Sequence, residues 1–476
     1  MENSAGQRDI LCVPGRKRWR SILGESGVGN RGLTEEVKVS VYLDLKKKIK
    51  SRTAVVTVVG LGYVGLPIAL EFCKKGFKVN GLDTNANRVK KLKKGISYIN
   101  DISSEDISRV LRKKKPFYVT MDEKVLDGSD AIIVCVPTPL RKTKEPNISY
   151  VISASRTLSR HLRSGQMIIL ESTTYPGTTR EVILPVLEKR GLKADRDFYL
   201  AFSPERIDPG NPKYDFTNIP KVIGGFTKYG TELGRLLYSQ VIKKVVGVSN
   251  PEAAEVTKLL ENTFRIVNIG LINEFADLCH RLGIDVWEVI KAAGTKPFGF
   301  MPFYPGPGIG GHCIPADPMY LSWKAQTVGF KTKMIDLAAE VNRNVPGNIV
   351  KRIGRMLAAG RKKIKDSRIF IIGVTYKRDV NDLRESPALE IIDILQKKKA
   401  KVSYHDPYIP RLDLHGLKLR SSGLSSPCLK RQDIVLIVAD HSGMDYRMIA
   451  DNARLILDTR NAFARSNIKG DNIVKL

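Results

Sequence analysis

The chain has 476 residues, a formal net charge of +30, and 42% hydrophobic and 27% charged residues. Its length is too great for a single core and indicates two or three domains, while its composition is ordinary for a soluble globular protein. No apolar run is long enough to cross a bilayer, so we expect no membrane segment.

The first fifty residues are basic and contain no long apolar stretch, which argues against a secretory signal. We expect residues 1–50 to form a disordered basic extension, with a targeting segment or translation from a misplaced start as alternatives. The folded part is expected to begin near Arg52.

The basic side chains are spread along the chain without interleaved aromatic residues. A charge of this size can mark a nucleic-acid-binding protein, but this spacing favours a basic solvated surface that steers an anionic substrate. We therefore expect no nucleic-acid partner.

The six cysteines and six histidines form no metal-type pairs, which predicts free thiols in a reducing cytoplasm and no bound metal.

A first α/β unit is predicted for residues 51–250. A β-branched strand runs into Gly60-Leu-Gly-Tyr-Val-Gly65, and a helix follows over residues 66–75. Strands are expected at residues 55–59, 78–82, 131–136 and 167–170. Strands that alternate with helices in this order predict a parallel, doubly wound sheet.

Three glycines between the first strand and the first helix match the dinucleotide-binding fingerprint. Gly60 permits the tight turn, Gly62 lets a pyrophosphate approach, and Gly65 lets the helix pack on the strand. Asp83 ends the second strand, where a carboxylate accepts hydrogen bonds from ribose hydroxyls and repels a 2′-phosphate. We therefore predict that the cofactor is NAD rather than NADP.

Two loops leave the carboxyl edge of the sheet, where ligands bind. Thr138 follows the strand at 131–136, and Ser172 and Thr173 follow the strand at 167–170. Their hydroxyl groups can hold the cofactor or its substrate, and turn formation is the alternative for each of them.

A helical region is predicted for residues 251–345, with helices over 251–282 and 318–344. Long helices between two α/β units often form a spine for self-association, so we expect a homodimer. Lys258 and Asn262 lie four residues apart and share one helical face. Such a pair can polarise an alcohol oxygen or hold an oxyanion, although a solvated position is usual for a helical lysine.

The segment 305–318 is rich in glycine and proline, and it predicts a loop that holds Cys313 rather than a packed helix or strand. Asp317 follows four residues later. Together with the dinucleotide fingerprint, this loop predicts an oxidoreductase that forms a covalent adduct with its substrate through Cys313. The alternative is that Cys313 is a small buried hydrophobic residue.

A second α/β unit is predicted for residues 346–476, with a helix over 387–396. Its strands are expected at residues 368–373, 401–405, 434–439 and 455–458. It lacks a full G-x-G-x-x-G, so it holds a nucleotide differently or holds none. The predicted fold is therefore α/β, with two Rossmann-like doubly wound domains joined by a central helical dimerisation region.

Over about residues 52–476 the chain resembles the UDP-glucose/GDP-mannose dehydrogenase family. The resemblance rests on segments 60–65, 136–139, 203–206, 258–262, 310–317, 373–377 and 384–386. It implies an NAD domain, a helical dimer region and a C-terminal domain for the nucleotide of a sugar. It also implies that the sugar's C6 alcohol becomes a carboxylate in two hydride transfers, with two NAD and one water, through a thiohemiacetal and a thioester on Cys313.

The resemblance implies roles for individual residues. Lys258 would activate the thiol, Asn262 would stabilise the oxyanion, and Asp317 with Glu205 would position water and transfer protons. The implied catalytic residues are Cys313, Lys258, Asn262, Asp317, Glu205 and Thr138. The implied cofactor contacts are Gly60, Gly62, Tyr63, Val64, Gly65, Asp83, Arg88, Thr138, Ser172, Thr173 and Arg384. The implied substrate contacts are Glu205, Arg206, Lys258, Asn262, Phe303, Tyr304, Gly310 and Lys377.

Two departures from the UDP-glucose enzymes bear on the substrate. Those enzymes often carry Lys where this chain has Ala316, and a second Glu where it has Pro209. Arg206 and the segment 296–304 look like the subgroup that acts on UDP-N-acetylhexosamines. We expect UDP-N-acetylglucosamine as the substrate, with UDP-N-acetylmannosamine or UDP-glucose as alternatives.

Two other protein classes share part of this pattern. The β-hydroxyacid dehydrogenases have the same first domain and a helical Lys and Asn, but they perform one hydride transfer and need neither Cys313 nor a second α/β unit. The non-enzyme alternative is a basic nucleic-acid-binding protein with a relic dinucleotide fold. The joint presence of Cys313, Lys258 and Asp317 argues against it.

Overall fold

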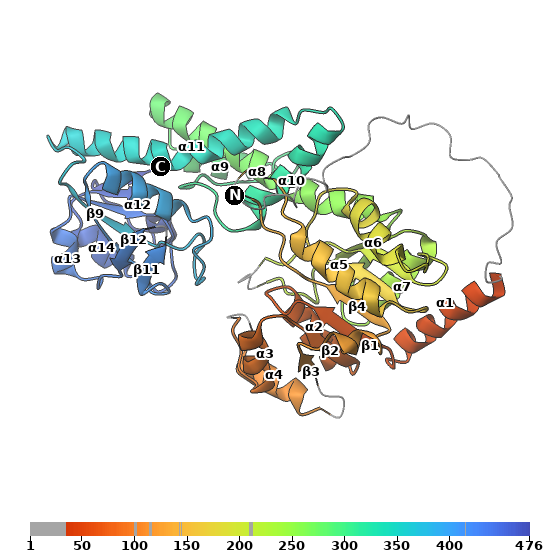
Figure 1. Ribbon diagram of the computed structural model, residues 1–476. Helices are drawn as coiled ribbons and strands as arrows, with labels where there is room; N and C mark the ends of the chain where they lie inside the picture. Colours follow the sequence, from red (N-terminus) through yellow and green to blue (C-terminus); the bar gives the residue numbers. More distant parts are fainter. Residues whose placement is uncertain are drawn as a thin grey trace, which may run out of the picture.

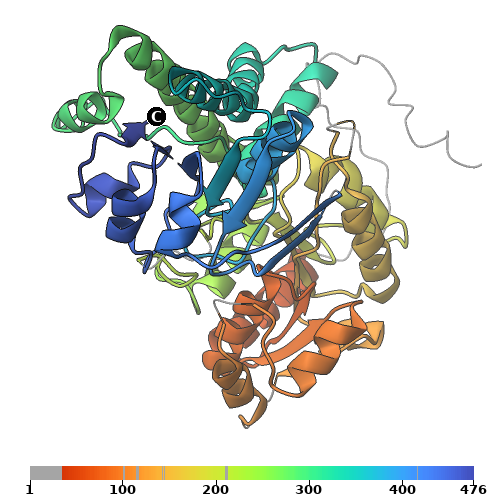
Figure 2. The same cartoon turned by 90° about the vertical axis from the view of Figure 1, so that its left-hand side faces the viewer.

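The computed structural model describes residues 35–99, 102–113, 117–141, 143, 145–208, 213–414 and 416–476. Two α/β units are joined by long helices, which cross the top of Figure 1 above the first unit and the blue second unit. Figure 2 turns the second unit toward the viewer and shows the first unit below it. No helix in these ranges combines the length and the apolar character that a membrane span requires.

The first unit is an eight-stranded sheet with the order β3-β2-β1-β4-β5-β6-β7-β8. Its strands are β1 (Val55–Val59), β2 (Lys78–Leu82), β3 (Tyr118–Thr120), β4 (Ala131–Val134), β5 (Met167–Leu170), β6 (Tyr199–Phe202), β7 (Lys221–Gly225) and β8 (Val245–Val248). Strands β1 to β6 are parallel, as predicted, but β7 pairs antiparallel to β6. A parallel strand needs a crossover connection, and the described residues between β6 and β7 contain no helix to provide one.

Helices cover both faces of this sheet. They are α2 (Gly65–Lys74), α3 (Ala86–Lys93), α4 (Ser104–Leu111), α5 (Ser149–His161), α6 (Leu184–Glu188) and α7 (Lys228–Tyr238), with short turns at Glu123–Leu126 and Thr179–Ile183. Alternate residues of β5 join different cores: Met167 and Ile169 pack on one face, and Ile168 and Leu170 on the other. Burial on both faces explains why the strand is a continuous apolar run.

Residues 35–50 correct the expectation of a disordered extension. They form α1 (Glu35–Lys50), in which Leu45 and Ile49 are buried. Tyr42 donates a hydrogen bond to Glu232 on α7 at 2.5 Å, so α1 packs on the first unit. Apolar residues at a three-to-four-residue spacing provide the buried face. Residues 1–34 lie outside the described residues.

The helical region contains α8 (Pro251–Leu282), α9 (Val286–Ala293), α10 (Cys313–Thr327) and α11 (Lys333–Ala359). Helix α8 ends as predicted at Gly283, which adopts a left-handed conformation with φ 71°. The single helix predicted over 318–344 is wrong, because the chain turns at Gly329, with φ 77°, between α10 and α11. Helix α11 then continues through Pro346 to Ala359.

The second unit is a five-stranded parallel sheet with the order β10-β9-β13-β14-β15. Its strands are β9 (Arg368–Ile372), β10 (Lys401–His405), β13 (Ile434–Ile437), β14 (Ile456–Asp458) and β15 (Ile473–Lys475), with a hairpin of β11 (Arg411–Leu414) and β12 (Leu417–Arg420). Its helices are α12 (Pro387–Lys397), α13 (Ser426–Lys430), α14 (Tyr446–Asn452) and α15 (Ala462–Arg465). The four predicted strands are confirmed, whereas β15 and the hairpin were not predicted.

Candidate active site

The turn from β1 into α2 gives the three fingerprint glycines different surroundings. A Cβ on Gly60 would lie 2.5 Å from the carbonyl oxygen of Cys135, and a Cβ on Gly65 would lie 1.9 Å from that of Gly60. A Cβ on Gly62 would meet no atom within 4 Å. Packing therefore requires glycine at the first and third positions, while Gly62 borders open space that fits an approaching pyrophosphate.

Asp83 is buried at the end of β2. Its carboxylate accepts hydrogen bonds from the backbone N–H groups of Leu61 and Asn85, both at 2.8 Å. Arg88 Nη1 lies 3.5 Å from Asp83 Oδ2. These bonds fix a carboxylate beside the glycine turn, in the position where a dinucleotide presents its ribose.

Ser172, Thr138 and Thr173, the hydroxyl residues at the sheet edge, make different contacts. Ser172 Oγ accepts a hydrogen bond from the backbone N–H of Val136 at 2.9 Å, so it braces two neighbouring strand ends. Thr138 is buried, and its backbone oxygen accepts a hydrogen bond from Tyr320 of α10 at 2.5 Å. Thr173 is half-buried in the same loop. The contacts of Ser172 support turn formation, whereas Thr138 links the first sheet to the cysteine helix.

Cys313 is the first residue of α10 rather than part of a loop, which corrects the prediction. The preceding loop packs on the second unit: Gly311 donates its backbone N–H to Arg384 O at 2.9 Å, and a Cβ on Gly310 would lie 2.5 Å from Tyr376 Cβ. Cys313 is exposed by its surface area, although protein atoms surround most of its thiol. A position at a helix N-terminus favours a thiolate, because the helix dipole and unpaired N–H groups attract negative charge.

Three predicted catalytic residues form a buried cluster between α8 and α10. Asn262 Nδ2 donates to Asp317 Oδ2 at 2.6 Å, and Lys258 Nζ lies 3.8 Å from the same oxygen. Lys258 also donates to the backbone oxygen of Glu205 at 2.5 Å. The side chains of all three cluster residues are buried, so these charges interact in a low-dielectric environment.

Burial controls the protonation of this cluster. It raises the pKa of Asp317 to about 6, against the opposing effects of Lys258 and the Asn262 hydrogen bond. The pKa of Cys313 is also raised, because the surrounding protein removes water from the thiol and Asp317 adds negative charge. Lys258 and Arg384 pull the Cys313 pKa down but are outweighed. Lys258 therefore acts on the Cys313 pKa in the predicted direction, and its role in activating the thiol stays a prediction.

Glu205 belongs to a second buried group that the sequence did not indicate. Its Oε1 accepts hydrogen bonds from the backbone N–H groups of Arg206 and Ile207, at 2.7 and 2.5 Å. Its Oε2 lies 3.7 Å from Nζ of Lys221, which in turn lies 2.6 Å from Glu171 Oε2. A lysine at the start of an apolar strand was the available signal for this group.

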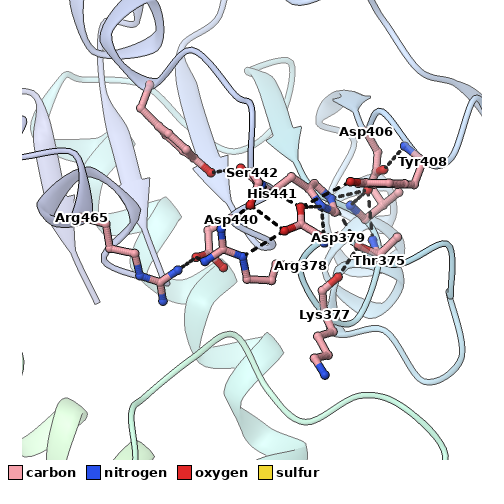
Figure 3. A network of polar contacts seen from close by, with 12 residues as sticks. Thr375, Lys377, Arg378, Asp379, Asp406, Tyr408, Asp440, His441, Ser442 and Arg465 are labelled. Atoms are coloured by element: carbon pink, nitrogen blue, oxygen red, sulfur yellow. Dashed lines mark hydrogen bonds and ion pairs between the residues drawn. The ribbon is translucent and has the colours of Figure 1, made fainter. Parts of the chain in front are cut away.

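The second unit reaches the site from the opposite side. The Arg384 guanidinium lies 5.6 Å from the ring centroid of Tyr63 in the glycine turn, and it forms an ion pair with Asp382. Lys377 points away from the polar network of the second sheet (Figure 3), and its Nζ lies 2.8 Å from Asp208 Oδ1. Arg384 and Lys377 therefore link the second unit to the first unit across the site.

The second sheet repeats the turn of the first. Gly373 has φ 80° and donates to His405 O at 3.0 Å, as Gly60, with φ 90°, donates to Leu82 O at 2.8 Å. Asp406 accepts the next N–H group, as Asp83 does. Figure 3 shows Asp406 bonded to buried His441 at this edge. The second unit thus repeats the glycine turn and the strand-end carboxylate of the first, without the second and third glycines of the fingerprint.

Comparison with known proteins assigns all three parts of the chain to one family. Models of the UDP-glucose/GDP-mannose dehydrogenase family match residues 54–242 with the NAD binding domain, 252–344 with the central domain and 370–465 with the UDP binding domain. The chain belongs to the UDP-glucose/GDP-mannose dehydrogenase family. It is an NAD-dependent UDP-sugar dehydrogenase with an α/β fold of two Rossmann-like units, as its sequence predicted.

Relatives within the family differ in the sugar that their names carry. The chain is similar to UDP-N-acetyl-D-glucosamine 6-dehydrogenase of Pseudomonas aeruginosa, with 36% identity over 402 residues, which are 84% of this chain and 93% of that protein. It is also similar to UDP-N-acetyl-D-mannosamine dehydrogenase of Pyrococcus horikoshii, with 33% identity over 412 residues, which are 85% of this chain and 95% of that protein. A solved structure of the UDP-D-ManNAc dehydrogenase from Pyrococcus horikoshii superimposes with a TM-score of 0.79 at 32% identity and covers 88% of this chain and 98% of that one.

Other predicted substrate contacts have protein partners in this family member. Arg206 forms a two-pronged ion pair with Glu261 of α8, at 2.6 and 3.2 Å. Phe303 packs edge-on against Phe264, and Tyr304 stacks on Trp287. Within the described residues, no group of three or more His, Cys, Asp or Glu side chains could hold a metal ion. The roles of Arg206, Phe303 and Tyr304 toward a sugar remain predictions.

Asp317 should control the acid side of the pH profile. Below its pKa of about 6 the protonated carboxyl no longer offsets the charge of Lys258, so kcat/KM is expected to rise as pH increases through about 6. In Asp317→Asn this limb should vanish and activity should fall about a hundredfold. Initial rates between pH 5 and 9 measure both effects, and an acid limb that persists in the variant would assign it to another group.

Proposed function

We propose that this UDP-sugar dehydrogenase oxidises the C6 alcohol of a UDP-N-acetylhexosamine to the uronic acid in two oxidations through a covalent Cys313 thioester. The observation that carries the proposal is the position of Cys313, exposed at the start of α10 and electrostatically coupled to Lys258, Asp317 and Arg384. We divide the chain into an NAD domain over 51–250, a helical region over 251–345 and a UDP-sugar domain over 346–476, which the matched family ranges support.

NAD, when bound, supplies the hydride acceptor for each oxidation, and Gly60, Gly62, Gly65 and Asp83 are the residues that would hold it. Lys258 and Asn262 bind the oxygen on which negative charge develops. One donor of the Asn262 amide goes to Asp317, and the amide has a second donor for this oxygen. Lys258 has three donors and uses one on the backbone of Glu205.

The second oxidation needs a nucleophile, because an aldehyde becomes a good hydride donor only after addition to its carbonyl carbon. The Cys313 thiolate forms a bond to that carbon and the carbonyl oxygen takes a proton. The resulting thiohemiacetal then loses this proton and a hydride to become a thioester. Water then forms a bond to the carbonyl carbon, the C–S bond breaks, and the thiolate is restored. Glu205 takes the proton of the attacking water, a role that its buried Oε2 without a hydrogen-bond partner supports.

The sugar is proposed to be UDP-N-acetylglucosamine, with UDP-N-acetylmannosamine and UDP-glucose as alternatives. Ala316 is small and buried beside Asp317, at the position where UDP-glucose enzymes often carry a lysine. NADH formation should be compared for UDP-N-acetylglucosamine, UDP-N-acetylmannosamine, UDP-N-acetylgalactosamine, UDP-glucose and GDP-mannose. We expect kcat/KM for the first to exceed that for UDP-glucose at least about tenfold, and a preference for UDP-glucose would contradict the proposal.

A homodimer through α8 is part of the same proposal. The exposed face of this helix carries Val256, Leu260, Phe264, Leu271, Phe275, Leu278 and Leu282. An apolar stripe of this length is unusual on a monomer and suits a self-complementary contact between two copies.

Because a catalytic thiol must stay reduced, we also propose a reducing cytoplasm, in keeping with the free thiols of all five cysteines among the described residues.

Leu271→Glu should break this dimer, because it places charges in the centre of an apolar interface. Sedimentation velocity is expected to give about twice the chain mass of 53.1 kDa for the wild type and the chain mass for the variant. Leu43→Glu on α1 is the matched control, since Leu43 is 52% exposed and Leu271 is 50% exposed. A wild type that sediments as a monomer would refute the interface.

A further inference from the structure

Lys221 is a charged residue in the core of the first unit. It is 4% exposed at the start of β7, where its Nζ lies 2.6 Å from Glu171 Oε2. Tyr238 donates a hydrogen bond to the other oxygen of Glu171. Burial acts to lower the pKa of Lys221, but Glu171 and Glu205 outweigh it and raise this pKa, so the side chain is an ammonium. A buried ammonium is costly, and one carboxylate would be enough to compensate its charge.

A second carboxylate nevertheless faces the same ammonium. Glu205 Oε1 is saturated by the backbone N–H groups of Arg206 and Ile207, while the buried Oε2 has no hydrogen-bond partner. Lys221 Nζ lies 3.7 Å from this oxygen. The distance is too long for a hydrogen bond and short enough for strong attraction at low dielectric. A buried carboxylate oxygen with an ion pair but no hydrogen bond is an arrangement that stability alone does not require.

Charged and titratable groups from several elements surround Glu205. Lys258 of α8 bonds its backbone oxygen, and Cys313 of α10 interacts with it electrostatically. The buried thiol of Cys135, the Tyr238 hydroxyl and the Glu171 carboxylate interact with it from the sheet side. Lys221 is the cation of this group whose side chain faces the carboxylate itself.

We propose that Lys221 is a positioning residue for Glu205: its ammonium, shared with Glu171, orients the Glu205 carboxylate so that Oε2, which has no hydrogen bond, can take a proton. The inference rests on the proposed function of Glu205 in thioester hydrolysis. In that step the water oxygen bonds to the carbonyl carbon, the C–S bond breaks, and the water proton moves to Glu205 Oε2. Lys221 can then pair with Glu171 alone while Glu205 is neutral, and it attracts Glu205 again once the proton has left.

The test compares four proteins: wild type, Lys221→Met, Lys221→Arg and the double variant Lys221→Met with Glu171→Gln. The double variant removes both members of the 2.6 Å ion pair. It therefore leaves no unpaired Glu171 charge that would destabilise the fold. Each protein is mixed with NAD and excess UDP-sugar at neutral pH. Quenched samples are analysed by intact-protein mass for the sugar adduct on Cys313, and by absorbance for NADH.

For Lys221→Met and the double variant we expect hydrolysis of the adduct to slow about tenfold at neutral pH. The adduct should accumulate, the KM for NAD should stay unchanged, and Lys221→Arg should recover most of the rate.

A folded double variant that hydrolyses the adduct at the wild-type rate and accumulates none would overturn the inference and leave Lys221 a partner of Glu171 only. A wild type that forms one NADH per sugar and no adduct would instead overturn the proposed function. The two failures are therefore distinguishable in the same experiment.

Discussion

Cys313→Ser is expected to stop the reaction after the first oxidation, so that one NADH forms per sugar and an aldehyde is released. A serine hydroxyl is a far weaker nucleophile at neutral pH than a thiol, and its ester would hydrolyse slowly if it formed. Lys258, Asn262 and the nucleotide turn are unchanged, so the alcohol can still be oxidised. The rate of carboxylate formation should fall by at least about a thousandfold. Product analysis by mass spectrometry with hydroxylamine present to trap the aldehyde measures this directly.

Cys428→Ser provides the matched control, because this half-buried cysteine lies on α13 of the second unit. It should retain wild-type stoichiometry. Alkylation should select Cys313, which is exposed, over Cys73, Cys135 and Cys279, which are buried. Because the pKa of Cys313 is raised, its alkylation rate should increase toward alkaline pH. Full carboxylate production by Cys313→Ser would rule out a covalent role for the sulfur.

Gly65→Ala is expected to destabilise the protein by about 3 kcal/mol or more, whereas Gly62→Ala should leave the free energy of unfolding within about 0.5 kcal/mol of the wild type. The first substitution forces a methyl group to within 1.9 Å of the Gly60 carbonyl oxygen, and the second places it in open space. That space is where the dinucleotide pyrophosphate approaches. Gly62→Ala should therefore fold normally and bind NAD at least about tenfold more weakly.

Urea denaturation and NAD titration by calorimetry separate these effects. The two variants carry the same change three residues apart in one turn, so each serves as the control for the other. Unchanged NAD affinity in Gly62→Ala would mean that the cofactor does not cross this turn. A stable Gly65→Ala protein would contradict the close packing of α2 on β1.

Local sequence patterns predicted the parts of the fold that depend on burial and turn chemistry. The strands around Gly60 and Gly373 are apolar on both faces, and the left-handed turn that each glycine supplies leaves few alternatives. Asp83 was predictable because a strand end on the carboxyl edge of a parallel sheet has a fixed relation to the cofactor. The pair of Lys258 and Asn262 followed from helical spacing alone.

Other features depend on tertiary contacts that no local pattern contains. The helix that begins at Cys313 is held in place by Tyr320 on Thr138 and by the second unit, so the glycines before it indicated only a loop. Gly310 is required by the Cβ of Tyr376, which lies 66 residues further along the chain. Lys221 reads as an ordinary strand-end lysine until Glu171 and Glu205 are placed around it.

The NADH yield with a limiting amount of UDP-sugar tests the central claim most directly. The wild-type enzyme is incubated with excess NAD until absorbance is constant, and the sugar product is identified by mass. Oxidation through a Cys313 thioester predicts two NADH and one uronic acid for each sugar consumed. One NADH and a stable keto or aldehyde product would contradict it and favour the single hydride transfer of the β-hydroxyacid dehydrogenases.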